Sequence, residues 1–154
     1  EAQWRDGGID ADFVQDNHSL SRETGTLRGL HLQTPPLAQA KLVRVARGRV
    51  FDVVVDIRTG SPTFRKWVGI ELSVDKGNQL YIPTGFAHAF LTLEPDTEFL
   101  YKVSAPYSQP NDRSIRFDDP AIGIDWPIDI NLDTLSAKDR DAGLLVETDT
   151  GFVY

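Results

Sequence analysis

The chain contains no cysteine, and this absence excludes disulfide bridges, thiolate metal sites and cysteine nucleophiles together. It also has no apolar run near the ~20 residues that cross a bilayer, and the acidic, polar start from Glu1 to Asp12 lacks the pattern of a signal peptide. We therefore expect a cytoplasmic protein with no membrane partner, whose chemistry depends on other side chains.

Basic residues are the minority among the charges. The 16 lysines and arginines stand against 23 aspartates and glutamates, which gives a formal net charge of −7. Phosphate backbones are bound by concentrated lysine and arginine, so we expect no nucleic-acid partner. A smaller phosphorylated ligand is compatible with this charge if basic groups gather in one pocket.

The length and composition predict one globular domain over residues 1–154. With 40% hydrophobic and 25% charged residues, the chain resembles folded rather than disordered proteins. Because the sequence opens on Glu1 rather than methionine, we expect that part of the N-terminal segment is missing.

Short apolar segments dominate the chain from Phe13 onward, with a period near two and frequent turn residues between them. The clearest stretch, 41–57, places LVRVA and VFDVVVDI on either side of Arg47 and Gly48, which predicts a β-hairpin. Further strands are expected at residues 13–19, 27–33, 64–72, 79–82, 86–93 and 98–103.

Many short strands without intervening helices are typical of a sandwich, a jelly roll or a small barrel, and a jelly roll fits best. After Ala105 the chain is irregular, and only Ser136 to Gly143 has a helical pattern, with Ser136 as N-cap and Asp139 as the carboxylate of a capping box. We therefore predict an all-β jelly roll with a short C-terminal helical segment.

Three histidines, His18, His31 and His88, are the first candidates for chemistry, although a single histidine in a strand more often has a structural role. Many jelly rolls bind a metal through a His-x-His pair, a carboxylate and a later histidine. Gln33 stands where the second histidine of that pair would follow His31. We therefore predict no metal site and favour acid–base chemistry.

Strand parity places several polar side chains beside apolar ones. His31 and His88 can face the interior, and so can Tyr101, whose phenol would need a polar partner or a function there. Lys41 shares the parity of apolar neighbours, and the alternative is a lysine that snorkels at the mouth of the barrel. Asp52 lies in a strand with apolar residues on both faces, so parity does not decide its direction.

Eight segments in consistent order carry a resemblance from Phe13 to Asp139. They are QDNHS (15–19), LRGLHLQ (27–33), KLVRV (41–45), GRVFDVVVDIRTGSPTF (48–64), QLYIPTGFAHAFLTL (79–93), EFLYK (98–102), DDPAIGIDWP (118–127) and LSAKD (135–139). Together they resemble the dTDP-4-dehydrorhamnose 3,5-epimerase family. The resemblance implies a cupin jelly roll that forms homodimers, uses no metal or organic cofactor, and acts in the synthesis of dTDP-rhamnose and related deoxysugars.

The resemblance also implies catalytic roles for four residues. His31 matches the general base that removes a proton next to the keto group, and Asp139 matches the carboxylate that orients it and raises its basicity. Tyr101 matches the proposed general acid on the opposite side of the sugar ring. Lys41 matches a residue near the ketone oxygen, where a cation stabilises an enolate.

A set of substrate-binding residues is implied in the same way, with contacts to the nucleotide, the diphosphate or the sugar. The set comprises Gln15, Asp16, Asn17, Arg28, His88, Tyr107, Asp112 and Lys138. Tyr107 matches the ring that stacks on thymine, whereas Asp112 stands where the family often has glutamate. The family's upstream Arg-Gly-Phe-Phe stretch has no counterpart in this sequence.

One pair of implied site residues conflicts with regular strand geometry. Arg28 and His31 are three residues apart, so a regular strand would direct them to opposite faces. We therefore predict a β-bulge near Gly29, or an Arg28 that enters the site from its rim.

The leading hypothesis is an isomerase that converts dTDP-4-dehydro-6-deoxy-D-glucose to dTDP-4-dehydro-L-rhamnose by epimerisation at C3 and C5. The nearest alternative is a relative that inverts only one of these carbons. A non-catalytic sugar-nucleotide-binding cupin and a metal-dependent cupin oxygenase are further alternatives. The residues His31, Lys41, Tyr101 and Asp139 speak against the first of these, and Gln33 speaks against the second.

Overall fold

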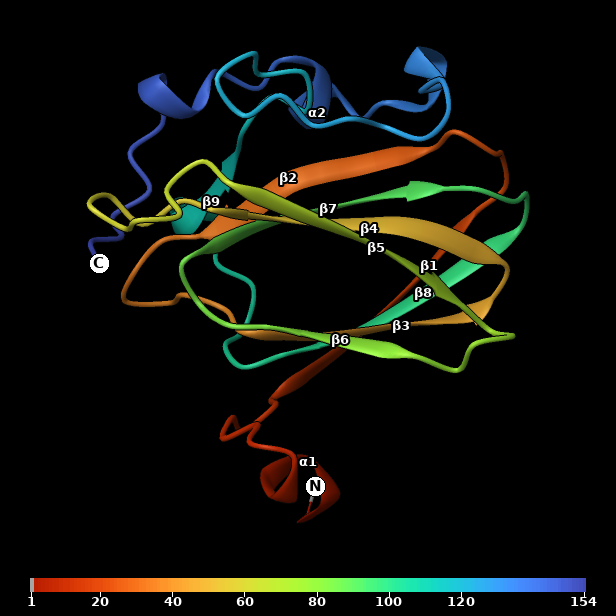
Figure 1. Cartoon of the computed structure of the whole chain (residues 1–154), viewed down its shortest axis with the longest axis horizontal. Coiled ribbons are helices and arrows are strands. Elements are labelled where there is room, and N and C mark those ends of the chain that lie inside the picture. The colour runs from red at the N-terminus through yellow and green to blue at the C-terminus, as the bar shows by residue number, and fades with distance from the viewer. Residues whose placement is uncertain (1) are drawn as a thin grey trace.

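The computed structural model describes residues 2–154, with side chains from Trp4 onward, so Glu1 of the predicted domain lies outside the described residues. Two antiparallel sheets face each other (Figure 1). One sheet has the order β1 (Gln15–Ser21), β8 (Thr97–Val103), β3 (Lys41–Arg47) and β6 (Gln79–Ile82). The other has the order β5 (Trp67–Ser73), β4 (Arg49–Asp56), β7 (Phe86–Thr92), β2 (Leu27–Gln33) and β9 (Asp112–Ser114). This arrangement confirms the predicted all-β jelly roll.

The few helices lie at the two ends of the chain and in its C-terminal third. They are α1 (Ala2–Asp6), η1 (Gln109–Asn111), η2 (Leu132–Thr134), α2 (Ala137–Arg140) and η3 (Leu145–Glu147). Within residues 2–154, none of these helices is long and apolar enough to cross a membrane. The segment that carries α2 lies over the outer face of the five-stranded sheet, opposite the N-terminal end of the chain (Figure 1).

The predicted β-hairpin over residues 41–57 is wrong, although both of its strands exist. β3 pairs with β6 and β8, whereas β4 pairs with β5 and β7, so the turn at Gly48 carries the chain from one sheet to the other. Both strands lie inside their sheets and have hydrogen-bonded neighbours on both sides. β4 is buried on both faces, whereas β3 exposes Arg44 on one of its faces. The local turn signal does not indicate which neighbours these are.

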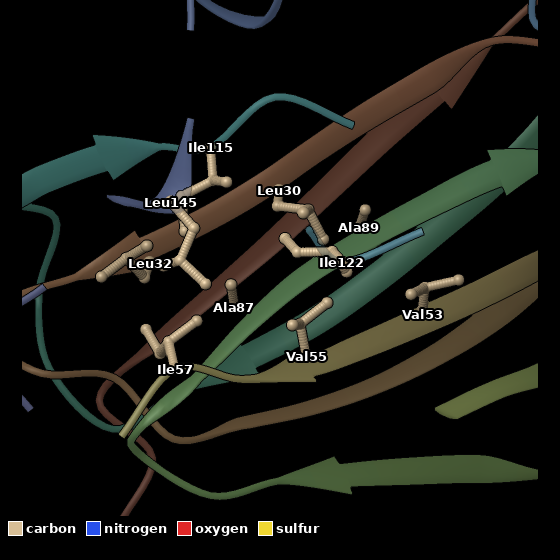
Figure 2. Close-up of a cluster of buried hydrophobic side chains, with 10 residues drawn as sticks. All are labelled: Leu30, Leu32, Val53, Val55, Ile57, Ala87, Ala89, Ile115, Ile122 and Leu145. Carbon is tan, nitrogen blue, oxygen red and sulfur yellow. The ribbon is translucent and has the colours of Figure 1, made fainter. Parts of the chain in front are cut away.

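Two apolar layers hold the sandwich together. The inner layer, between the sheets, includes Val43, Val50 and Phe99. The outer layer lies between the five-stranded sheet and the C-terminal segment, and Figure 2 shows Leu30, Val53 and Ile122 meeting there with seven other apolar side chains. β4 is therefore buried on both faces, and its side chains at even positions, including Asp52, share the face of Val50 toward the inner layer.

Helix α2 is shorter than the predicted stretch from Ser136 to Gly143, but its N-cap is confirmed. The Ser136 hydroxyl accepts a hydrogen bond from the Asp139 backbone N–H at 3.1 Å. The predicted capping box is incomplete, because the Asp139 carboxylate is directed to His31. The cap thus fixes the direction of a carboxylate that enters the site.

The predicted bulge at Gly29 is confirmed. Arg28 pairs with Phe90 and His31 pairs with His88, so three steps along β2 match two steps along β7. Gly29 has φ +122°, and a Cβ atom there would lie 2.5 Å from Ala89 Cβ and from the His88 carbonyl oxygen. Only glycine fits this close approach, and the bulge turns Arg28 and His31 to the same side.

Candidate active site

A cavity of about 140 Å³ opens between the two sheets and collects most of the predicted catalytic residues. It is lined by Ser19, Arg28, His31, Lys41, His88, Phe90, Phe99 and Tyr101. β2 and β7 supply the histidines from one sheet, and β3 and β8 supply Lys41 and Tyr101 from the other. A larger depression of about 460 Å³, lined in part by Asp16 and Lys102, contains neither His31 nor Lys41. The smaller cavity is therefore the candidate active site.

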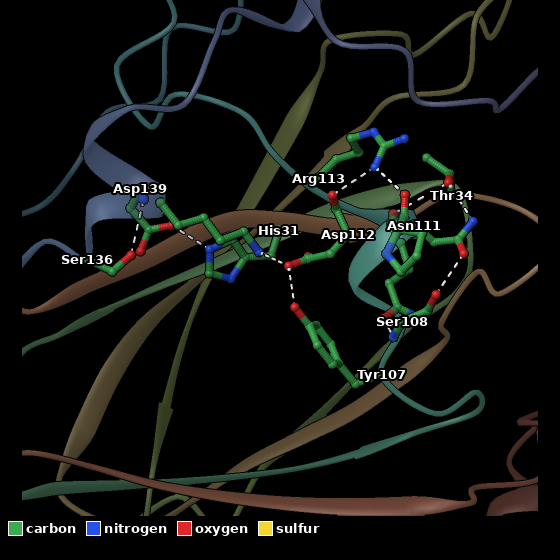
Figure 3. A network of polar contacts seen from close by, with 12 residues as sticks. His31, Thr34, Tyr107, Ser108, Asn111, Asp112, Arg113, Ser136 and Asp139 are labelled. Atoms are coloured by element: carbon green, nitrogen blue, oxygen red, sulfur yellow. Dashed lines mark hydrogen bonds and ion pairs between the residues drawn. The ribbon is translucent and has the colours of Figure 1, made fainter.

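His31 and Asp139 form a hydrogen-bonded pair at the edge of this cavity (Figure 3). The Nε2 atom of His31 lies 2.5 Å from Asp139 Oδ1, and an ionised carboxylate can only accept, so Nε2 carries the proton. The other ring nitrogen, Nδ1, is then unprotonated and able to accept a proton. This is the tautomer that a general base requires.

The pKa of His31 depends on two opposing effects. Burial lowers the pKa of His31 below its ordinary value and outweighs Asp139, whose hydrogen bond and charge raise it. Burial by itself raises the pKa of Asp139, but the hydrogen bond and charge of His31 lower it overall. At neutral pH the site therefore contains a neutral imidazole held by a carboxylate.

Tyr101 and Lys41 lie across the cavity from His31 on the four-stranded sheet. Burial, with the charge of Asp112, raises the pKa of the Tyr101 phenol, so it remains a proton donor at neutral pH. Burial lowers the pKa of Lys41 to about 8, with Asp52 opposing the change. At pH 7 most of Lys41 is still an ammonium, and the cavity combines a base, an acid and a cation.

Asp52 is a buried residue of the site that the sequence did not indicate. Both of its carboxylate oxygens lie within hydrogen-bond distance of His88 Nε2, at 3.0 and 2.9 Å, and its side chain is fully buried. The His88 ring stacks on Phe99 with centroids 6.1 Å apart. A second histidine–carboxylate pair thus lies beside the first, on neighbouring strands.

Lys138, Asp112 and Tyr107 form a polar group near the cavity, in which the charge of Lys138 acts on His31 and that of Asp112 on Tyr101. Figure 3 shows Asp112 and Tyr107 of this group. Lys138 Nζ lies 2.5 Å from Asp112 Oδ2, and the Tyr107 hydroxyl donates to the same oxygen at 3.3 Å. Tyr107 is mostly exposed, which leaves its ring accessible to a ligand. Asp112 therefore contacts two of the other predicted binding residues despite its short side chain.

Strand β1 separates three predicted substrate-binding residues onto two faces. Gln15 and Asn17 are half-buried and hydrogen-bonded to each other at 2.8 Å, and the side-chain Oε1 of Gln15 accepts from the Tyr107 backbone N–H. Asp16 is exposed and pairs with Lys102 at 2.7 Å on the opposite face of the sheet. Because alternate side chains of a strand point in opposite directions, the structure does not bring Asp16 to the cavity.

Gln33, which occupies the position of a metal-binding histidine in other jelly rolls, has a structural role. Its amide nitrogen donates to the carbonyls of Leu37 and Pro106, and its oxygen accepts from the Ser108 backbone N–H. It therefore ties the loop that carries Tyr107 to β2. Among residues 2–154, no group of three or more histidine, aspartate or glutamate side chains is arranged to hold a metal ion.

Comparisons with known proteins show the family of the chain. A family model described as dTDP-4-dehydrorhamnose 3,5-epimerase matches residues 1–147. The dTDP-4-dehydrorhamnose 3,5-epimerase of Sinorhizobium fredii is 53% identical over 154 residues, which cover 100% of this chain and 78% of that protein.

Two solved structures extend the comparison to three dimensions. The dTDP-6-deoxy-D-glucose-3,5-epimerase of Legionella pneumophila, in complex with dTDP-4-keto-L-rhamnose, has a TM-score of 0.91 and 44% identity, over 100% of this chain and 82% of that one. A 3'-monoepimerase from Streptomyces bikiniensis, in complex with dTDP-quinovose, has a TM-score of 0.86 and 34% identity, over 95% of this chain and 74% of that one. The fold is thus the cupin-like jelly roll of these epimerases, and the chain belongs to the dTDP-4-dehydrorhamnose 3,5-epimerase family.

Proposed function

We propose that this protein is an isomerase that epimerises C3 and C5 of dTDP-4-dehydro-6-deoxy-D-glucose and yields dTDP-4-dehydro-L-rhamnose. The observation that supports this function best is the placement of an imidazole and a phenol on opposite sheets, at the two sides of one cavity that also contains an ammonium. Family membership gives the substrate class, since the relatives are dTDP-4-dehydrorhamnose 3,5-epimerases.

Each inversion consists of two proton transfers and an enolate between them. Nδ1 of neutral His31 removes the proton from the carbon next to the ketone, and the electron pair of the broken C–H bond moves onto the carbonyl oxygen. The Lys41 ammonium stabilises the resulting negative charge. The Tyr101 hydroxyl then returns a proton to the same carbon from the opposite side, which inverts the centre. Exchange with solvent restores the neutral imidazole and the phenol before the second carbon reacts.

The protonation states in the cavity support these roles. The pKa of His31 lies below its ordinary value and that of Tyr101 above, so both are neutral at pH 7. A pKa of about 8 leaves most of Lys41 charged at that pH. A preorganised cation at a developing oxyanion is worth on the order of 100- to 1000-fold in rate.

Binding of the nucleotide part is proposed to depend on residues in and near the cavity. Arg28 and Lys138 supply positive charge for the diphosphate, His88 contacts the sugar end, and the exposed ring of Tyr107 stacks on thymine. Gln15 and Asn17 lie next to the Tyr107 loop and are proposed to contact the nucleotide. These contacts gather basic groups locally in a chain whose net charge is −7.

Inversion at a single carbon is the second candidate function. The similarity to a 3'-monoepimerase at a TM-score of 0.86 supports it, because one fold serves both reactions. The 53% identity with a 3,5-epimerase along the whole chain favours double inversion, and we therefore place double inversion first.

We further propose a cytoplasmic homodimer. The outer face of the four-stranded sheet exposes the apolar side chains of Val14 and Leu20 beside edge strand β1. Size-exclusion chromatography with light scattering should give twice the mass of the chain, and a monomer at micromolar concentration would contradict the dimer.

Heavy water provides the direct test of the reaction. Incubation of the protein with the 4-keto-6-deoxy substrate in D₂O should place deuterium at both C3 and C5, as located by NMR. Label at one carbon would favour the single-centre enzyme, and no label would exclude an epimerase. His31→Ala should abolish exchange at both carbons, with a loss of about 100- to 10,000-fold, whereas Tyr101→Phe should keep some exchange and block inversion.

A further inference from the structure

Behind His88 of the cavity lies a titratable residue that the proposed reaction does not use. Asp52 is fully buried on β4, and its two oxygens face the Nε2 atom of His88 on the neighbouring strand. A carboxylate in such a position costs free energy unless positive or hydrogen-bonding groups surround it. A second positive group nearby would therefore lower the free-energy cost of an ionised Asp52.

Lys41 is a buried cation without a carboxylate in direct contact among the residues that the structure describes. It is 8% exposed, and within the described part of the chain no carboxylate oxygen lies within 4.0 Å of its ammonium to form an ion pair. A buried ammonium without a counter-charge tends to lose its proton. Lys41 must nevertheless stay charged to stabilise an enolate.

The charged groups around Lys41 come from several elements. Asp52 on β4 and Asp112 on β9 act to keep it protonated, and Lys138 on α2 acts against this. Three further titratable or charged groups line the same cavity: His31 and Arg28 on β2, and His88 on β7. Tyr101 also lines it, on β8, the strand paired with the strand of Lys41. Asp52 is the largest favourable influence, and Asp112 has Lys138 as a nearer partner at 2.5 Å.

We infer that Asp52 is a positioning residue with two partners. It fixes His88 by accepting its Nε2–H, and it provides the counter-charge across the sandwich for the Lys41 ammonium. This inference rests on the proposed function, in which Lys41 faces the ketone oxygen. Through Lys41, a residue on the five-stranded sheet sets the upper pH limit of a reaction that it does not touch.

The alternative is that Asp52 only satisfies the buried imidazole of His88. Burial raises the pKa of Asp52 above its ordinary value, and the charge and hydrogen bond of His88 and the charge of Lys41 offset only part of this rise. If this rise were large enough to keep Asp52 protonated at pH 7, Asp52 would hold His88 without any charge to offer Lys41. The two interpretations therefore differ in the charge of Asp52 and in its effect on Lys41.

Asp52→Asn separates the interpretations, because the amide keeps the shape and removes the charge. The variable to measure is kcat/KM between pH 5.5 and 9.5, which reports groups of the free enzyme. In the wild type, activity should fall above a pKa of about 8 as Lys41 loses its proton. In Asp52→Asn the alkaline limb of the kcat/KM profile should move at least about one pH unit toward acid. At pH 8 this shift lowers kcat/KM roughly fivefold further. An unchanged limb would overturn the inference.

Asp56→Asn is the matched control. Asp56 is a buried carboxylate on the same strand, but it binds Arg58, Ser61 and Thr63 outside the cavity. Its loss should lower stability and leave the alkaline limb in place. A shift as large as that of Asp52→Asn would mean that the limb responds to general loosening of β4.

A wild-type measurement keeps the inference testable if Asp52→Asn does not fold. The ¹³C resonance of the Asp52 carboxyl should show an ionised group from pH 6 to 9, and a neutral group at pH 7 would overturn the inference. The outcomes also separate the two proposals. A wild type without deuterium exchange refutes the proposed function, whereas exchange together with a neutral Asp52 or an unmoved limb refutes only the role of Asp52.

Discussion

His31 is subject to opposing influences, and its pKa determines the lower pH limit of the reaction. Burial lowers the pKa of His31 below 6.5, and Asp139 partly restores it. A general base works in its neutral form, so kcat/KM should fall as the pH drops through the pKa of folded His31. Asp139→Asn removes the restoring charge, and we expect the acid limb to move to lower pH while the rate at neutral pH falls about 100-fold or more.

Asp118→Asn provides the control for this prediction. Asp118 is an exposed carboxylate that pairs with Arg116, so its loss should leave the acid limb and the rate unchanged. An acid limb that stays in place in Asp139→Asn would contradict the pairing of Asp139 with His31.

At the residue level, the resemblance to a family identified the candidate site residues. Strand parity predicted which face of the sheet each side chain lies on. His31, Lys41 and Tyr101 were predicted as site residues, and the structure brings them to one cavity. Asp52 was not found, because its strand is apolar on both faces and its partner His88 belongs to a strand distant in the sequence. Asp16 was included with its neighbours although a strand alternates its side chains.

At the level of elements, the bulge in β2 requires a residue without a side chain at position 29. Gly29→Ala would combine an unfavourable positive φ with a Cβ placed 2.5 Å from Ala89 Cβ. We expect the free energy of unfolding to fall by about 2–5 kcal/mol in urea titrations. Because the bulge turns Arg28 and His31 into one cavity, the folded fraction should also lose activity.

Gly60→Ala is the comparison for the Gly29 variant. Gly60 also has a positive φ, +87°, but a Cβ there would meet nothing within 4 Å. Its cost should be limited to backbone strain of about 1 kcal/mol, with activity intact. Equal losses in the two variants would contradict the argument from close packing.

Strand positions were predictable from alternation, and strand partners were not. The turn at Gly48 has the composition of a hairpin, yet β3 and β4 belong to different sheets. Pairing depends on contacts between residues distant in the sequence, such as Val43 with Tyr101, which no local pattern contains. The bulge was predictable because it follows from two residues, Arg28 and His31, that must reach one site.

For the whole molecule, we predict a single cooperative unfolding transition, since the chain is expected to form one domain. dTDP should raise the midpoint temperature, with about 2.7 kcal/mol of added stability when the ligand is at 100 times its Kd. Lys138→Ala should reduce this effect, because Lys138 is a cation whose charge acts on the cavity residues His31 and Lys41 and is proposed to bind the diphosphate. Two separate calorimetric transitions would contradict the single domain, and an unchanged midpoint with saturating dTDP would contradict the nucleotide site.

The stacked rings of Phe90 and Phe99 have a consequence for substrate choice. One ring comes from each sheet, and their centroids are 4.1 Å apart beside the cavity. Their contact separates the two sheets, and so it sets the distance between His31, which takes a proton, and Tyr101, which returns one. Evolution can thus alter which ring carbon comes within reach by changing the size of apolar side chains, while the reacting groups themselves stay the same.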